Sequence, residues 1–156
     1  MRWLLPLLFV IPLKAFPESA GKVIVFLSSH CPCSRDHEKY LGDLAKLYPQ
    51  ISFTGIHSNA DEELESSKAH FREAALPFPV VEDEHSKLAE QYKALKTPHA
   101  FLVSNDGKIV YQGGVTDSHA VHSARKFYLK DAIEDLIGKR TVRVSEGRTL
   151  GCVISR

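Results

Sequence analysis

The chain has 156 residues, of which 44% are hydrophobic and 25% charged, and its formal net charge at pH 7 is +1. This length is enough for one domain with a hydrophobic core, and the composition excludes a disordered or fibrous protein. The balanced charge excludes a broadly basic surface for nucleic acid. Only the stretch from Lys139 to Arg156 is locally basic, and we interpret it as a solvated surface, with a partner contact as the alternative.

Residues 1–20 have the pattern of an export signal. Arg2 gives a charged start, Trp3–Leu13 is apolar throughout, and Ala15 or Ala20 can precede a cleavage point. The apolar run is shorter than a membrane-spanning helix requires. We therefore expect an exported protein, in the periplasm of a bacterium, where disulfides persist. An uncleaved N-terminal membrane anchor is the alternative.

Apolar runs that alternate with amphipathic segments predict an α/β fold. Unbroken apolar runs are typical of buried parallel strands, and Asp106-Gly107 between two such runs predicts a hairpin turn. The expected order is strand 23–28, helix 33–48, strand 51–57, helix 61–75, a short strand or extended link at 76–81, helix 84–95, strands 100–103 and 108–113, and helix 123–137. This order places helices on both faces of a mixed sheet.

Two of the three cysteines stand in His30-Cys31-Pro32-Cys33, between the first strand and the first helix. Proline disfavours a helical residue before it and suits the first helical position, so Cys31 is expected to cap the helix. A thiolate there accepts backbone N–H groups and lies at the positive end of the helix dipole, which lowers its pKa. We predict that Cys31 is a nucleophile and that Cys33 is its disulfide partner.

Two other interpretations of this motif stay open. The cysteines can be small buried hydrophobic residues. They can also hold Cu(I) together with His30 or His37, as in a metallochaperone, because soft thiolates suit that ion. A structural zinc site is disfavoured, since Cys-x-Cys is not its usual spacing and the chain has no second cysteine pair.

The cysteine motif after the first strand and Thr97-Pro98 before the hairpin resemble the thioredoxin fold, and more narrowly the exported redoxins of the TlpA/ResA and AhpC/TSA type. The resemblance covers residues 21–138 and implies a thioredoxin-like domain there, with a tail at 139–156. It implies a thiol–disulfide oxidoreductase without an organic cofactor, which acts on protein dithiols or disulfides and needs a redox partner. It also implies a cis peptide at Pro98, facing the active cysteine.

The chain departs from the family pattern at two points. Thioredoxins carry Trp-Cys-x-x-Cys, whereas here one residue separates the thiols, so the direction of electron flow stays open. Peroxiredoxins carry Pro-x-x-x-Thr/Ser-x-x-Cys; Ser28 fits the hydroxyl position, but Ile24 stands in place of the proline. A thiol peroxidase, with Cys31 as the peroxidatic residue and Cys33 or Cys152 resolving it, is therefore a further alternative.

Cys152 lies in Gly151-Cys152-Val153-Ile154, which resembles the end of these redoxins. It is a candidate to resolve a bond on Cys31 or to bridge to a second chain, and the alternative is an idle thiol. Thr97 is an auxiliary candidate beside Pro98. His30 is expected to favour the thiolate by its charge.

Several other polar residues are expected to be structural or solvated. We expect Glu62 and Glu63 to be a solvated start of the second helix, and His37 to face solvent. We expect a capping and turn cluster before the final helix, formed by Asp117, His119 and His122.

Overall fold

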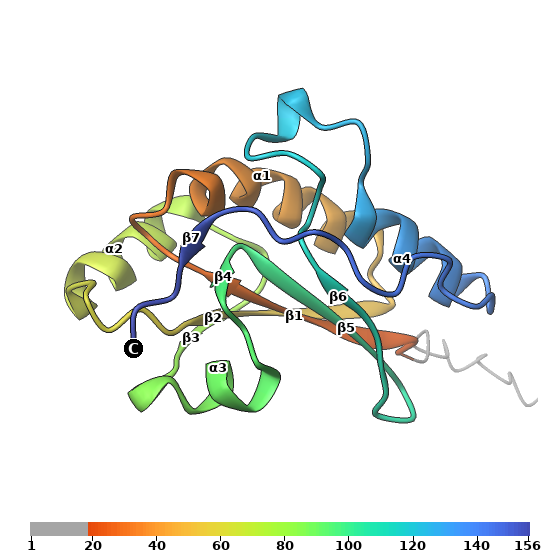
Figure 1. Ribbon diagram of the computed structural model, residues 1–156, viewed down its shortest axis with the longest axis horizontal. Helices are drawn as coiled ribbons and strands as arrows, with labels where there is room; N and C mark the ends of the chain where they lie inside the picture. Colours follow the sequence, from red (N-terminus) through yellow and green to blue (C-terminus); the bar gives the residue numbers. More distant parts are fainter. Residues whose placement is uncertain (1–18) are drawn as a thin grey trace, which may run out of the picture.

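The computed structural model describes residues 19–156 (Figure 1). The predicted signal segment at 1–20 therefore lies almost wholly outside the described residues. Among residues 19–156, no helix has both the length and the hydropathy needed to cross a membrane.

A mixed five-stranded sheet with the order β3-β2-β1-β5-β6 forms the centre of the fold. Its first three members are parallel to one another, while β5 runs antiparallel to both β1 and β6. The strands are β1 Gly21–Leu27, β2 Ile51–His57, β3 Val80–Glu82, β5 His99–Ser104 and β6 Ile109–Gly113. The predicted α/β fold with a mixed sheet is confirmed, and so is the hairpin at Asp106-Gly107, which joins β5 to β6.

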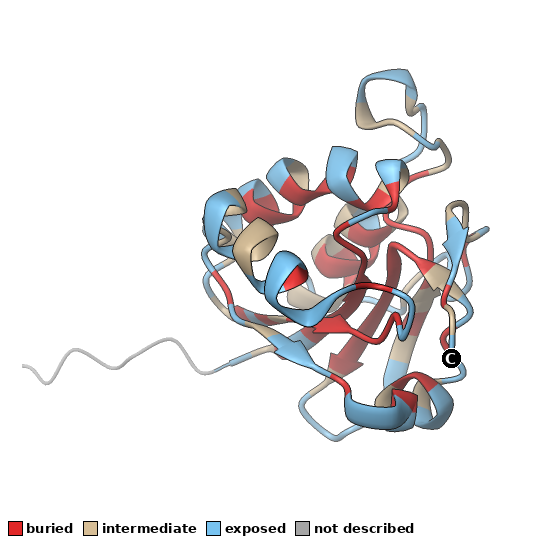
Figure 2. Ribbon diagram, turned by 90° about the vertical axis from the view of Figure 1, so that its left-hand side faces the viewer, coloured by how far each residue is buried: buried red, intermediate tan, exposed pale blue. Residues whose placement is uncertain are grey.

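Helices cover both faces of this sheet, as predicted (Figure 1). They are α1 Pro32–Leu47, α2 Leu64–Ala74, α3 Lys87–Tyr92 and α4 Tyr128–Ile137, with short 3-10 turns at Glu84–Ser86 and Val121–Ser123. Alternate residues of β1 point to opposite faces of the sheet. Val23 and Val25 pack with α1 and α4, whereas Ile24 and Phe26 pack with α3. Figure 2 shows the result, with buried strands at the centre and helices exposed on their outer sides.

Two predicted helices begin later than the hydrophobic pattern indicated. The predicted helix 61–75 starts at Leu64, because the Glu63 carboxylate accepts the amides of Glu65 and Ser66 and so caps it. The predicted helix 123–137 starts at Tyr128. The preceding residues form a loop that the Asp117 carboxylate holds by accepting the amides of Arg125 at 2.8 Å and Lys126 at 3.0 Å.

The segment 139–156 folds back along the domain instead of leaving it. It first runs beside β6, where Gln112 donates its amide to Ser145 O at 2.9 Å and accepts that of Gly147 at 2.9 Å. It then forms β7 Cys152–Val153, which pairs antiparallel with β4 Lys96–Thr97 in a small second sheet. The sequence pattern did not predict either of these short strands. Figure 1 shows β7 lying close to the start of α1.

Candidate functional site

The loop between β1 and α1 presents Cys31 as predicted. Cys31 is the N-cap of α1, with φ −69° and ψ 116°, and Pro32 is the first helical residue. The Ser28 hydroxyl organises the loop, because it accepts the amides of Cys31 at 2.8 Å and His30 at 3.2 Å. His30 itself is exposed.

The Cys31 sulfur lies against the residue before the cis peptide. Its thiol donates to Thr97 O at 3.2 Å, and the Thr97–Pro98 peptide is cis, as the resemblance implied. The buried Thr97 hydroxyl makes no hydrogen bond to a nitrogen or oxygen of residues 19–156. This hydroxyl can donate a hydrogen bond to a thiolate on Cys31.

The electrostatics of the loop favour ionised Cys31. Burial acts to raise the pKa of the Cys31 thiol, but hydrogen bonds from the side chains of Cys152 and Thr97 and from the backbone of Ser34 and Cys152 hold it below its ordinary value. The Ser34 amide belongs to the first turn of α1, so the predicted contribution of the helix N-terminus is present.

The pKa of Cys33 is shifted in the opposite direction to that of Cys31. Burial and the neighbouring Cys31 raise the pKa of the Cys33 thiol. Its sulfur lies 3.2 Å from Nδ1 of His119, which comes from the loop between β6 and α4. The expectation that His119 belongs only to a turn cluster is therefore wrong, because the loop folds back over the first turn of α1 and brings the ring to the thiol.

Cys152 completes a group of three thiols. It is the register partner of Thr97 in the β4–β7 pair, and the Thr97 carbonyl is the group that accepts from the Cys31 thiol. Burial, followed by the side chain and the charge of the neighbouring Cys31, raises the pKa of the Cys152 thiol to about 12. All three cysteines are free, with Cys31 buried, Cys33 half-buried and Cys152 exposed.

Glu62 was expected to be solvated, and this prediction is wrong. Its side chain is only 2% exposed and lies beneath the cysteine loop. It accepts hydrogen bonds from the Ser28 hydroxyl, from the Ser29 amide at 2.9 Å and from His57 Nε2 at 3.0 Å. Burial acts to raise the pKa of Glu62, but these donors hold it below its usual value. The ionised carboxylate thus supports Ser28, which in turn holds the amide of Cys31.

His37 was expected to face solvent, and this prediction is also wrong. The ring is buried; Nδ1 meets the Cys33 carbonyl at 2.8 Å and Nε2 meets the Thr116 hydroxyl at 2.9 Å. Burial lowers the pKa of His37, which keeps the ring neutral at pH 7. His37 therefore ties the loop that carries His119 to α1. The helical pattern gives no signal for this role, since the partner Thr116 is far along the chain.

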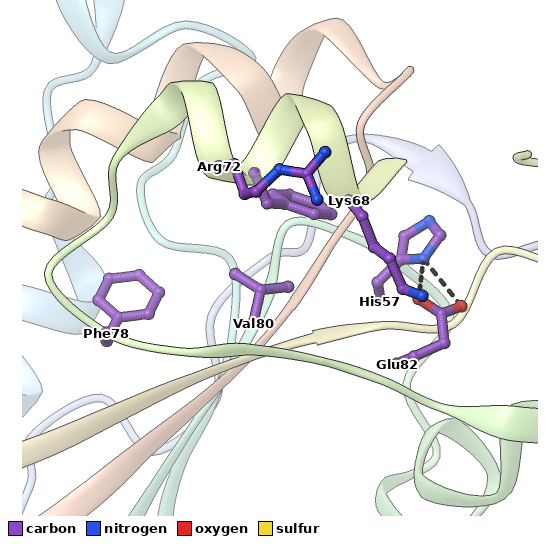
Figure 3. A pocket seen from close by; sticks show the side chains of 7 residues that line it. His57, Lys68, Arg72, Phe78, Val80 and Glu82 are labelled. Atoms are coloured by element: carbon purple, nitrogen blue, oxygen red, sulfur yellow. Dashed lines mark hydrogen bonds and ion pairs between the residues drawn. The ribbon is translucent and has the colours of Figure 1, made fainter. Parts of the chain in front are cut away.

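A cavity of about 260 Å³ lies beyond His57, between α2 and β3 (Figure 3). His57 connects it to Glu62, because its Nδ1 contacts Glu82 at 2.8 Å while its Nε2 contacts Glu62. None of the three cysteines lines it. The lining residues are His57, Lys68, Phe71, Arg72, Phe78, Val80 and Glu82. Over the part of the chain that the structure describes, no group of three or more His, Cys, Asp and Glu side chains is arranged to hold a metal ion.

Comparison with known sequences places this geometry in context. A family model described as the AhpC/TSA family matches residues 10–112. The thiol-disulfide oxidoreductase ResA of Bacillus thuringiensis subsp. konkukian is 29% identical over 106 residues, which are 65% of this chain and 58% of that protein. That of Bacillus anthracis is 30% identical over 99 residues, 61% of this chain and 55% of that protein. The chain thus spans less than two thirds of these relatives' length.

Solved structures agree on the fold. An uncharacterized conserved protein from Geobacillus kaustophilus superposes with a TM-score of 0.80 at 30% identity, covering 90% of this chain and 79% of that one. A secreted disulfide oxidoreductase from Mycobacterium tuberculosis superposes with a TM-score of 0.53 at 19% identity, covering 60% of this chain and 68% of that one. A thioredoxin-like protein in its oxidised form gives 0.64 at 15% identity, over 78% and 80% of the two chains. The fold is therefore thioredoxin-like.

Proposed function

Since the chain belongs to the AhpC/TSA family, we propose that it is a thiol–disulfide oxidoreductase in which Cys31 is the nucleophile and Cys33 the second thiol. The observation that carries this proposal is the position of Cys31. It caps α1, lies against Thr97 and the cis peptide of Pro98, and has a lowered pKa. The thiolate is the reactive form in disulfide exchange.

The reaction proceeds in two exchanges. The Cys31 thiolate attacks one sulfur of a protein disulfide, forms a mixed disulfide and releases the other sulfur as a thiolate. Cys33 then attacks the Cys31 sulfur, which closes a Cys31–Cys33 bond and releases the second substrate thiolate. Two electrons pass from the dithiol to the substrate, and His119 Nδ1, 3.2 Å from the Cys33 sulfur, is placed to take the proton that Cys33 loses. In this proposal, Pro98 positions the substrate backbone beside Cys31.

The same exchanges run backwards when a more reducing dithiol meets the oxidised protein. The reduction potential of the Cys31–Cys33 pair relative to the compartment decides which direction prevails. We propose protein dithiols or disulfides as the substrates and a separate redox partner that restores the starting state.

We further propose that the protein is exported, with residues 1–20 as its signal peptide. The apolar run Trp3–Leu13 supports this, as does the description of the Mycobacterium tuberculosis structure as a secreted protein. The periplasm of a bacterium is an oxidising compartment in which such chemistry is useful.

A redox titration tests the proposed function. The protein is equilibrated in glutathione buffers, alkylated and weighed by mass spectrometry, with Cys152→Ser beside the wild type. A reversible two-electron transition that involves Cys31 is expected, and its midpoint gives the direction of electron flow. Absence of any disulfide on Cys31 at every potential would contradict the proposal. Rapid peroxide consumption would then point to a thiol peroxidase, and stoichiometric Cu(I) retained after dialysis would point to a metallochaperone.

A further inference from the structure

The proposed nucleophile is the least accessible of the three thiols. Cys31 is only 2% exposed, whereas Cys152 is exposed and lies opposite Thr97, whose carbonyl oxygen is 3.2 Å from the Cys31 sulfur. The segment that carries Cys152 therefore lies beside the buried Cys31 thiol.

The segment that carries Cys152 is docked as an added strand. β7 pairs antiparallel with β4 so that Cys152 lies opposite Thr97 and Val153 opposite Lys96, and Ile154 donates its amide to Leu95 O at 3.0 Å. Addition of an extended peptide to a free strand edge is a common mode of peptide recognition. Here the peptide belongs to the chain itself.

Three further contacts fix the register of this strand. A Cβ at Gly151, which has φ +141°, would lie 1.9 Å from Thr97 O, so the close approach requires glycine. Ile154 is 4% exposed and packs in the hydrophobic cluster beneath α3. Beyond it, Arg156 donates to Ala94 O at 2.6 Å. The strand is anchored on both sides of Cys152, which leaves the cysteine side chain against Cys31.

We infer that β7 is an internal peptide ligand of the cysteine site, and that Cys152 is a third redox-active thiol that exchanges disulfide bonds between the buried Cys31 and partner proteins. This inference rests on the proposed function, because it needs a Cys31–Cys33 bond to exchange. It assigns to the exposed sulfur of Cys152 the contact with the partner.

The internal step balances without an added oxidant. The Cys152 thiolate attacks the Cys31 sulfur of the Cys31–Cys33 disulfide, a Cys31–Cys152 bond forms, and the Cys31–Cys33 bond breaks. Cys33 leaves as a thiolate and receives the proton that Cys152 lost, so no electrons are gained or lost. A partner thiolate then attacks the exposed Cys152 sulfur and returns Cys31 as a thiolate.

The charges around Cys152 fit this order of events. The Cys31 thiolate contributes to the raised pKa of Cys152, so Cys152 stays protonated while Cys31 is reduced. Once Cys31 is part of a disulfide, its negative charge is gone and this contribution disappears. Cys152 therefore ionises more readily when there is a bond for it to attack.

Disulfide mapping tests the inference on the full chain. Cys33→Ser and Cys152→Ser are equilibrated in a buffer of oxidised and reduced glutathione, and their disulfides are mapped by mass spectrometry after digestion. We expect an intramolecular Cys31–Cys152 bond in Cys33→Ser and a Cys31–Cys33 bond in Cys152→Ser. If Cys152→Ser forms its bond but Cys33→Ser yields only a glutathione adduct on Cys31 with Cys152 free, the inference fails and the proposed function stands. If neither variant forms a bond to Cys31, the proposed function itself fails.

A second measurement tests the docking of β7 independently of redox chemistry. In Ile154→Asp the buried charge favours release of the strand, so alkylation of Cys31 is expected to become roughly tenfold faster or more. Val144→Asp is the matched control, because Val144 lies on the same segment, is 47% exposed and is outside β7. Equal rates in the two variants, with far-ultraviolet circular dichroism unchanged, would mean that β7 does not limit access to Cys31 and would overturn the inference.

Discussion

Two regions of the molecule bring groups to the Cys31 sulfur, and they are built in different ways. The front region is the loop from Ser28 to Cys33, in which neighbouring residues place the thiols at the start of α1. The back region is the pair of β4 and β7, in which Thr97 meets Cys152, and only the folded chain joins residues so far apart. The comparison shows that one reactive sulfur can be controlled by a local motif on one side and by long-range packing on the other.

The largest effect is expected from removing the sulfur that both regions share. Cys31→Ser should lower the rate of exchange with a disulfide-bonded model peptide by about a thousandfold or more, because no other thiol of the site has a lowered pKa. Cys33→Ser is the comparison, since it keeps the nucleophile and should retain the first exchange, after which Cys152 closes a bond to Cys31. Comparable turnover in Cys31→Ser would show that another thiol carries the reaction.

Breaking the back region alone should have the next largest effect. Gly151→Ala places a Cβ 1.9 Å from Thr97 O, so β7 must leave β4 and Cys31 should become alkylated faster. The expected loss of unfolding free energy is about 2–3 kcal/mol, measured by urea denaturation. Gly107→Ala is the control: φ is +83° there, but no atom lies within 4 Å of the added Cβ, so only about 1 kcal/mol is expected. Equal losses in both variants would refute a specific contact at Gly151.

Weakening the hydrogen bonds that Glu62 makes to the front region should have a smaller effect on stability. In Glu62→Gln the amide supplies one acceptor oxygen instead of two, so the Ser28 and Ser29 donors lose part of their partner. We expect a loss of about 1–3 kcal/mol at pH 7. The exposed Glu73→Gln is the control and should change stability by no more than about 0.5 kcal/mol.

Glu62 also predicts a pH dependence. Its pKa in the folded protein lies below the ordinary glutamate value of 4.5, so its carboxylate stabilises the fold above the unfolded pKa, and this stabilisation is lost as the pH falls through the folded pKa. Wild-type stability should therefore decline below about pH 4.5 more steeply than that of Glu62→Gln. Parallel curves of unfolding free energy against pH would exclude Glu62 as the titrating group.

The smallest effect is expected at Thr97, where the two regions meet. Thr97→Val removes the hydroxyl whose hydrogen bond lowers the pKa of Cys31, so the pH profile of Cys31 alkylation should move upward. Stability should hold or rise slightly, because the lost hydroxyl had no nitrogen or oxygen partner among the described residues. Thr97→Ser keeps the hydroxyl and should keep the profile. An unchanged profile in Thr97→Val would assign the lowered pKa to the other donors.

The sequence predicted those features whose causes lie close together along the chain. The apolar runs located β1 and β2, Asp106-Gly107 located the hairpin, and Pro32 located the cap at Cys31. The cis peptide at Pro98 followed from the resemblance to thioredoxins. Each of these signals lies within a few residues of the structure that it specifies.

Tertiary structure decided the environment of the thiols. Glu62 and His37 carry polar side chains that a sequence pattern assigns to solvent, yet both are buried because distant residues, Ser28 and Thr116, supply their hydrogen bonds. β4 and β7 have two residues each, too few for any hydrophobic period, and their pairing depends on Ile154 reaching the core beneath α3. By itself the sequence thus determined which thiol stands at the start of α1, since a helix terminus is a local feature. Which thiols touch Cys31, and which of them a partner can reach, depended on packing between segments that meet only in the folded chain.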